Sequence, residues 1–297
     1  MTVLGGLVAT TAALVDLVLP GGCAGCGLAA ARDPAGGRSG PVCATCRTAL
    51  DGPARPAWPD PVPAGLPPPW AVTVYAGEVR TMIVAHKEEG RLGLVRPLGD
   101  ALATSAAAAA AAARTRRNGA ALDALVLVPV PSRRSAVRMR GHDSTLRLAR
   151  RAARRLRTDD RIVEVLPVVR VARRLADQAG LDAAQRAANL QSALAVPDRW
   201  AAAVRGKHVV VVDDVITTGA SIAETTRALE AAGATVAGAA VVAATVRRHR
   251  GRPYPGDPHA TSVTSWHPPG SVVAPGRRPL GGYDSTSRCQ PQAKRPT

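Results

Sequence analysis

The chain has 297 residues, enough for one full α/β domain with smaller attachments, and 46% of them are hydrophobic, as in soluble globular proteins. Its formal net charge is +17, and only three of its 39 basic residues are lysine. An aromatic content of 2% disfavours a platform that binds by base stacking, whereas the charge fits either an anionic partner or a genomic bias toward arginine.

The first twenty residues are apolar and predict an amphipathic lead helix over 1–20. Their large apolar side chains fall on one helical face: Leu4, Leu7, Val8, Leu14, Val15 and Val18. A signal peptide is the alternative, but the stretch lacks a basic start and Asp16 interrupts it. No segment reaches the roughly 18 apolar residues of a membrane span, so we expect a cytoplasmic protein.

Residues 21–50 carry two cysteine pairs, Cys23 with Cys26 and Cys43 with Cys46. Two C-x2-C pairs at this distance are typical of a zinc ribbon, in which four thiolates hold a structural Zn²⁺. Disulfides are the alternative, but a cytoplasmic setting is reducing. Cys289 is left over in the C-terminal region.

Residues 51–70 are crowded with proline and predict either a linker or an extended wrap. From 71 to 246 the chain alternates between strand and helix patterns. The expected strands are 71–76, 125–130, 162–171, 208–212 and 234–243. The expected helices are 78–86, 98–117, 144–157, 182–190 and 219–232. This alternation predicts an α/β fold with a mainly parallel sheet flanked by helices. Residues 247–297 lack periodicity and predict a disordered tail.

The sharpest motif follows the apolar run Val209–Val212. Two acids, Asp213 and Asp214, precede a short turn and a helix start, with the sequence Thr217, Thr218, Gly219, Ala220 and Ser221. Amide groups at a helix N-terminus bind phosphate, and ligands in α/β proteins bind beyond the carboxyl ends of strands. Adjacent carboxylates suit ribose hydroxyls, directly or through Mg²⁺. Simple helix capping is the alternative reading of the acids.

This stretch resembles the phosphoribosyl-pyrophosphate motif of type I phosphoribosyltransferases. Further segments resemble the ComF family (competence protein F, phosphoribosyltransferase-like), and they follow in the expected order over about 1–246. These segments are the cysteine pairs, His86-Lys87 through Gly93, Val128–Pro131 with Arg140-Gly141, and Gln178, Arg186 and Asn189.

The resemblance implies that Asp213 and Asp214 contact the ribose hydroxyls and Mg²⁺, and that 217–221 bind the 5-phosphate. Ser132, Arg133 and Arg134 would face pyrophosphate, and Arg140 belongs to the same basic loop, which should lie near the pyrophosphate. Lys87 is either a phosphate ligand or a surface lysine. His142-Asp143-Ser144 departs from the family's usual aromatic-Asn-Gln run. Thr217 stands where 6-oxopurine-using members carry aspartate, which disfavours that substrate class.

Two functions follow from these features. The first is an enzyme that transfers the phosphoribosyl group of phosphoribosyl pyrophosphate to a nitrogen nucleophile. The second is a non-catalytic accessory protein of competence and DNA uptake, which binds single-stranded DNA and a helicase partner as the ComF resemblance implies. Arginines 133–157 would then contact the DNA backbone. The sequence leaves the oligomeric state open, a homodimer included.

Overall fold

The computed structural model describes residues 22–28, 40–116, 124–132, 134–158, 162–172 and 193–245. The predicted lead helix 1–20, the helix 182–190 and the tail 247–297 lie outside these residues. Within the described residues, none of the helices has the length and apolar character needed to cross a membrane.

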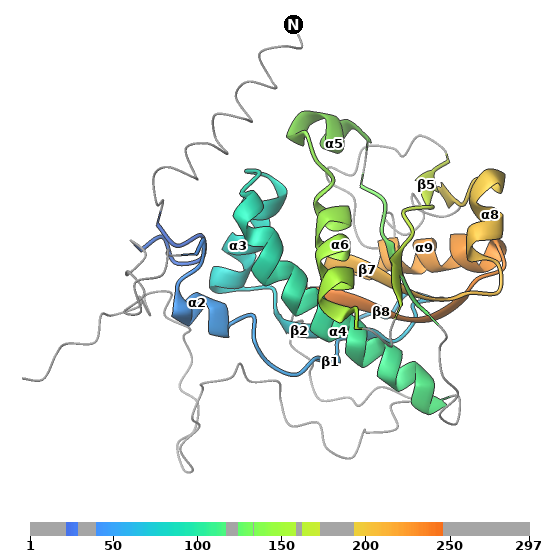
Figure 1. Cartoon of the computed structure of the whole chain (residues 1–297), viewed down its shortest axis with the longest axis horizontal. Helices are drawn as coiled ribbons and strands as arrows, with labels where there is room; N and C mark the ends of the chain where they lie inside the picture. Colours follow the sequence, from blue (N-terminus) through green and yellow to red (C-terminus); the bar gives the residue numbers. More distant parts are fainter. Residues whose placement is uncertain are drawn as a thin grey trace, which may run out of the picture.

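A six-stranded sheet forms the centre of the molecule (Figure 1). Its strand order is β1-β2-β8-β7-β3-β4. Its strands are β1 (Arg55–Pro56), β2 (Pro69–Val74), β3 (Leu125–Pro129), β4 (Val163–Val165), β7 (His208–Ile216) and β8 (Thr235–Ala244). Only the edge pair β1–β2 is antiparallel, and the other four pairs are parallel. The central strands are therefore buried on both faces, as their continuous apolar runs predict.

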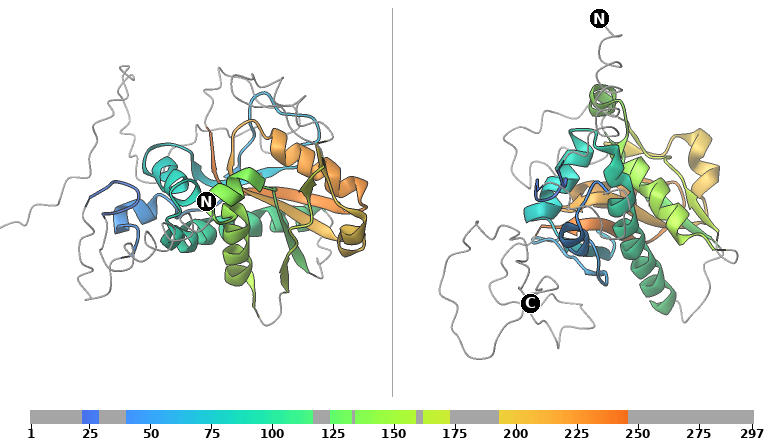
Figure 2. Two further views of the ribbon diagram at one scale, coloured as in Figure 1. Left: turned by 90° about the horizontal axis from the view of Figure 1, so that it is seen from above. Right: turned by 60° about the vertical axis from the view of Figure 1, so that its left-hand side comes forward.

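Helices cover both faces of this sheet (Figure 2). One core joins the sheet to α3 (Gly77–Lys87), α4 (Val95–Arg116) and α6 (Ser144–Leu156), and it takes Val210 and Val212 from β7. The other core joins α9 (Ala220–Ala231) to Val209 and Val211. Successive strand residues thus face opposite cores, and the predicted α/β class with a mainly parallel sheet is confirmed.

Small residues let α4 lie close to β8 and α6. A β-carbon built on Gly238 would lie 3.3 Å from that of Ala109, and one on Gly99 would lie 2.6 Å from Cβ of Arg151. The hydroxyl of Ser105 donates to the carbonyl of Val241 at 2.8 Å. The alanine-rich sequence of α4 therefore serves close packing against the sheet.

The proline-rich segment forms part of the domain core. Proline at an edge strand or at a strand's first residue removes no essential ladder bond, which is why β1 can end at Pro56 and β2 begin at Pro69. Between them the chain covers the α9 face, where Leu66 is buried and Trp58 packs against the same core. The proline-rich segment therefore packs against the sheet and the α9 core.

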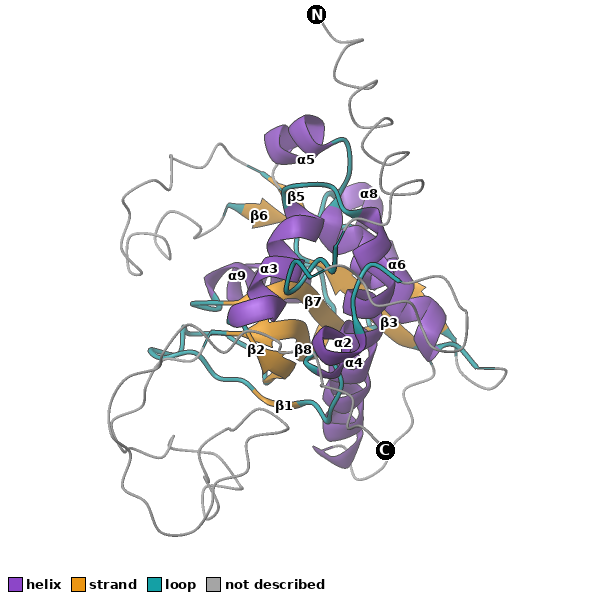
Figure 3. Ribbon diagram, turned by 90° about the vertical axis from the view of Figure 1, so that its left-hand side faces the viewer, coloured by secondary structure: helices purple, strands orange, loops and turns teal. Residues whose placement is uncertain are grey.

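Three differences from the predicted elements concern the other segments (Figure 3). The predicted strand 162–171 is two strands, because Pro167 has no N–H to continue the ladder. Its second half, β5 (Arg170–Val171), pairs with β6 (Leu194–Ala195) in a separate two-stranded sheet. No helix was predicted between the strand 125–130 and the helix 144–157, but the structure has α5 (Arg134–Arg140) there, and α8 (Asp198–Val204) was not predicted either. Two short elements complete the described set, α2 (Ala44–Thr48) and the 3-10 helix η1 (Leu92–Leu94).

Candidate functional site

The two acids lie near the carboxyl end of β7, the strand that runs through the middle of the sheet. β7 continues past them to Ile216, since Asp213 pairs with Val241 of β8 and Ile216 with Ala244. Adjacent residues of a strand face opposite sides, and here Asp214 is buried while Asp213 is half-buried. The pair therefore differs in access to solvent.

Lys87, the last residue of α3, forms an ion pair with Asp214. The distance from Nζ to Oδ2 is 2.7 Å, and the Asp214 side chain is 4% exposed. Burial disfavours the charge on Lys87, but the carboxylates of Asp214 and Asp213 outweigh it and raise the pKa of the lysine. The ammonium group is therefore a permanent cation beside the acid pair at neutral pH.

Asp213 favours its protonated, neutral form even though the Lys87 ammonium is nearby. Burial and the adjacent carboxylate of Asp214 raise the pKa of Asp213 to about 8, against the opposing effect of Lys87. Asp213 Oδ1 also accepts the backbone N–H of Asp214 at 2.8 Å. Asp213 therefore retains a proton near neutral pH, and a bound cation or hydroxyl donors would favour loss of that proton.

The turn after β7 opens helix α9. Gly219 has φ 75°, the left-handed conformation that favours glycine, and it stands at the N-cap. The first amide groups of α9 have no intrahelical acceptors, although Ala220 N lies 3.4 Å from Thr218 Oγ1. Thr217 is exposed, and Thr218 and Ser221 are half-buried. This is the local structure that binds a phosphate group.

The wrap segment closes over this turn. A β-carbon on Gly219 would lie 3.1 Å from both terminal methyl groups of Leu66 and 3.3 Å from Cγ of Pro59. The backbone at Gly219 is therefore held against residues that come from the proline-rich part of the chain. The sequence pattern gives no signal for this contact.

The loop between β3 and α6 holds two of the predicted site residues. The Ser132 hydroxyl donates to Asp143 Oδ1 at 3.1 Å, and Asp143 caps α6 by accepting from Leu146 N. Arg140 makes a two-point ion pair with Glu88, with Nε 2.9 Å from Oε2 and Nη2 3.0 Å from Oε1. Arg133 lies outside the described residues.

Two buried histidines fix the same loop against α3. His86 Nε2 donates to the carbonyl of Ser144 at 3.4 Å, and His142 Nδ1 lies 3.0 Å from the carbonyl of Arg140. The centroids of the two imidazole rings are 5.9 Å apart. Burial is the main cause that lowers the pKa of His86, and the buried ring therefore remains neutral. The His142-Asp143-Ser144 sequence thus braces the loop.

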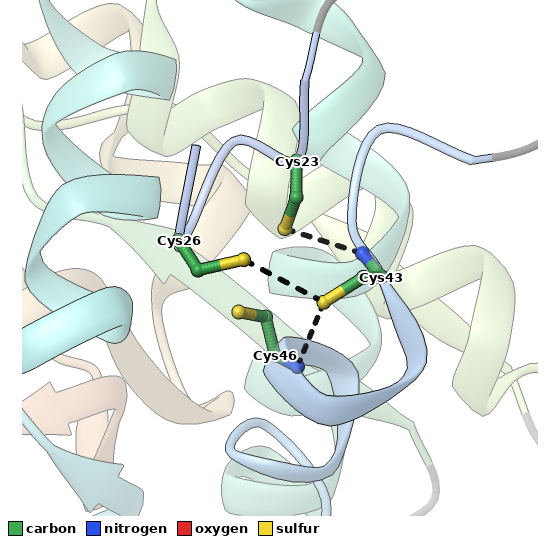
Figure 4. A group of neighbouring side chains, drawn as sticks. All are labelled: Cys23, Cys26, Cys43 and Cys46. Atoms are coloured by element: carbon green, nitrogen blue, oxygen red, sulfur yellow. Dashed lines mark hydrogen bonds between the residues drawn. The ribbon is translucent and has the colours of Figure 1, made fainter. Parts of the chain in front are cut away.

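The four N-terminal cysteines form a separate cluster (Figure 4). The ligand atoms of Cys23, Cys26, Cys43 and Cys46 all lie within 4.8 Å of one another, and Cys26 Sγ is 3.9 Å from Cys43 Sγ. Tetrahedral Zn²⁺ with Zn–S distances of about 2.3 Å requires sulfur separations of about 3.8 Å. The four thiols therefore fit a metal such as zinc.

The environment of the thiols agrees with a metal site. Burial opposes ionisation of Cys23, but N–H groups of Cys43, Cys26 and Gly25 lower its pKa to about 6. Burial and the neighbouring thiols raise the pKa of Cys46. Without a cation the cluster cannot hold four adjacent thiolates, and a bound metal would supply the compensating charge.

The described structure thus brings Lys87, Asp213 and Asp214 together, and it links Arg140 to the same helix through Glu88. Gln178, Arg186 and Asn189, which form one of the segments that resemble the ComF family, lie outside the described residues. Sequence reasoning missed Glu88 and Leu66. Glu88 follows the noted His86-Lys87 pair, but nothing local identifies its arginine partner.

Comparison with known families matches residues 142–271 to the phosphoribosyl transferase domain. The match includes the acid pair and the turn before α9, and it covers less than half of the chain. A search of curated proteins gives no match. The match supports a phosphoribosyltransferase domain in this chain, while α3 and the cysteine cluster precede the matched region. Membership of the ComF family stays a prediction.

Proposed function

We propose that this protein binds phosphoribosyl pyrophosphate and transfers its phosphoribosyl group to a nitrogen nucleophile. The observation that carries the proposal is the pairing of two acids with a glycine-capped helix start at the carboxyl end of β7. A sugar phosphate needs hydrogen-bond acceptors for its hydroxyl groups and, close by, hydrogen-bond donors for its phosphate oxygens. The family match over 142–271 supports the same class of substrate.

In this proposal each group has a defined part. The amides and hydroxyls of 217–221 hold the 5-phosphate, and the half-buried Asp213 accepts the ribose hydroxyls. Lys87 and Arg140 face the negative charge of the pyrophosphate. Its bond to C1 breaks with the electron pair going to pyrophosphate, as the nitrogen bonds to C1. The protein positions the reactants and stabilises the leaving group's charge.

Magnesium fits this site through few protein ligands. Mg²⁺ commonly binds one or two carboxylates together with substrate phosphates, and Asp213 is the accessible carboxylate of the pair. When bound, the ion would supply neutralisation of pyrophosphate charge. Asp214 is already paired with the ammonium group of Lys87, so Asp213 would be the residue that binds the magnesium ion.

Isothermal titration calorimetry with phosphoribosyl pyrophosphate, with and without Mg²⁺, tests the proposal. We expect saturable binding that strengthens with Mg²⁺ and is lost in Asp213→Asn. The exposed Asp198→Asn on α8 is the control with the same chemical change. Binding that survives Asp213→Asn unchanged, or no binding by the wild-type protein, contradicts the proposal.

A second candidate function, nucleic-acid binding, has one observation in its favour. Arg147, Arg150 and Arg154 line a groove of about 360 Å³ between α6 and the start of α4, together with Val95, His142, Asp143 and Leu146. No ion pair among the described residues involves these three arginines. Residues three and four apart share a helix face, so their guanidinium groups project into one groove.

Fluorescence anisotropy with a labelled single-stranded oligonucleotide tests this candidate. Replacing the three groove arginines by glutamine should weaken binding and reduce the salt dependence by about two released counterions. The matched control replaces three exposed arginines from other elements, Arg55, Arg80 and Arg199. Equal effects of the two triple variants would indicate general charge attraction and contradict a specific groove. A helicase partner stays a prediction.

A further inference from the structure

The cysteine cluster packs against α3, the helix that carries Lys87. Cys23 and Cys46 share one core with Met82 and Ile83 of this helix. A β-carbon on Gly25 would lie 2.8 Å from Cys46 Sγ and 3.2 Å from Cβ of Glu78. The backbone between the first two cysteines is therefore wedged between a thiol and the first turn of α3.

A second contact reaches the other end of the same helix. Arg91, just beyond α3, donates from Nη2 to the carbonyl of Gly22 at 3.3 Å. Its backbone N–H donates to the carbonyl of Ala85 in the last turn of α3. A β-carbon on Gly93 would lie 3.2 Å from that of Pro41. The cysteine segment thus contacts the chain at both ends of α3.

Three consecutive residues at the end of α3 contact three parts of the candidate site. His86 bonds the first residue of α6, Lys87 pairs with Asp214 of β7, and Glu88 pairs with Arg140. A displacement of α3 would therefore move the Lys87 ammonium away from Asp214. The same displacement would separate Glu88 from Arg140. α3 connects the cysteine cluster to the candidate site through direct contacts.

We propose that a metal ion on the four cysteines positions α3, so that metal binding and phosphoribosyl pyrophosphate binding are thermodynamically coupled. This inference rests on the proposed function. The described cysteine segment has little regular structure, with the five-residue α2 as its helix, and such segments depend on the metal to fold. Metal loss removes the support at both ends of α3 and leaves Lys87 and Arg140 less ordered.

Linkage makes the coupling measurable in both directions, since a metal that strengthens ligand binding is itself held more tightly by the ligand. Zinc-depleted protein, kept reduced, should bind phosphoribosyl pyrophosphate about tenfold more weakly than zinc-loaded protein. Conversely, the ligand should slow zinc release to a colorimetric chelator several-fold at fixed Mg²⁺. Release rates that do not respond to the ligand overturn the coupling.

Two comparisons separate coupling from general unfolding. Inorganic phosphate should bind zinc-depleted and zinc-loaded protein alike, because the turn at 217–221 does not contact α3 through any described hydrogen bond or ion pair. Loss of phosphate binding on zinc depletion would indicate collapse of the domain and overturn the inference. Arg91→Ala keeps all four cysteines, and it should retain zinc but show a smaller ligand effect on zinc release.

Hydrogen–deuterium exchange tests the positioning without the ligand. Zinc depletion should increase exchange over 77–88 while β7 and β8 stay protected. Unchanged exchange in α3 overturns the inference even if phosphoribosyl pyrophosphate binds well. Increased exchange in α3, combined with no binding of phosphoribosyl pyrophosphate to zinc-loaded protein, would instead retain the positioning and refute the proposed function.

Discussion

Lys87 Nζ lies 2.7 Å from Asp214 Oδ2, and this ion pair joins the end of α3 to the end of β7. The side chain of Asp214 is 4% exposed and that of Lys87 is 37% exposed, so a partly solvated lysine pairs with a buried acid. A buried charge is tolerated when it is paired. The half-buried Asp213 is consequently the member of the acid pair that remains accessible to a ligand.

Lys87→Met should weaken binding of phosphoribosyl pyrophosphate by at least about tenfold, since each 1.4 kcal/mol of lost interaction is tenfold in affinity. It should also lower the free energy of unfolding by roughly 1–3 kcal/mol, because Asp214 loses its charged partner. Calorimetry measures the first effect and urea denaturation the second.

Lys207→Met is the matched control for that substitution. Lys207 Nζ lies 2.9 Å from Glu164 Oε2, but both side chains are about 40% exposed. An exposed ion pair contributes about 0–1 kcal/mol, so this variant should keep both stability and ligand affinity. Similar losses in the two variants would mean that the Lys87 pair has no special role in the site.

Asp213 should make the protein's stability depend on pH in a defined direction. Its pKa is about 8 in the folded protein, above the ordinary value of 3.8, so the folded state binds the proton more tightly. The protonated Asp213 carboxyl therefore contributes to the free energy of unfolding. This contribution is fully present below pH 3.8 and is lost as pH rises through about 8. Urea unfolding of wild type and Asp213→Asn should therefore diverge progressively across this interval.

Comparing the two proteins isolates this carboxyl from other titrating groups. His86 acts in the opposite sense, because its lowered pKa costs stability as pH falls, and it is present in both proteins. The wild-type unfolding free energy should fall relative to that of the variant between pH 4 and 8. A constant difference across that range would show that Asp213 titrates normally.

Much of the fold could be predicted because its signals are local. The apolar run of β7, the acids after it and Gly219 at the helix start each follow from neighbouring residues, and the described elements agree with them. The split at Pro167 was also readable, since proline interrupts a ladder. The predicted strand 162–171 was wrong because its apolar pattern outweighed that signal.

The contacts that assemble the candidate site could not be predicted in the same way. Lys87 finds Asp214, and Glu88 finds Arg140, only after the strand order and the path of α3 are fixed. The position of Leu66 over Gly219 likewise depends on how the proline-rich segment wraps the sheet. Such pairings come from packing between distant segments, which local periodicity does not encode.

The cysteine cluster predicts about one zinc ion per chain in protein purified under reducing conditions. Cys46→Ser should abolish most of this zinc, because Cys46 is one of four thiols that converge within 4.8 Å. Cys289→Ser is the control, since this cysteine is not part of either pair in the sequence. Metal content by atomic absorption measures both. Full zinc retention in Cys46→Ser would contradict the four-cysteine site.

Gly219→Ala should lower stability by roughly 1–3 kcal/mol and weaken phosphate binding, because alanine is strained at φ 75° and its methyl would press on Leu66 and Pro59. Gly206→Ala has nearly the same φ, 73°, with nothing within 4 Å of the added carbon, so it reports the backbone strain alone. The larger loss at Gly219 then measures the contact with the wrap segment. Leu66→Ala removes a buried side chain and is itself destabilising, but it should cost less stability in the Gly219→Ala background than in the wild-type protein. Equal losses at the two glycines would mean that the wrap does not constrain the turn.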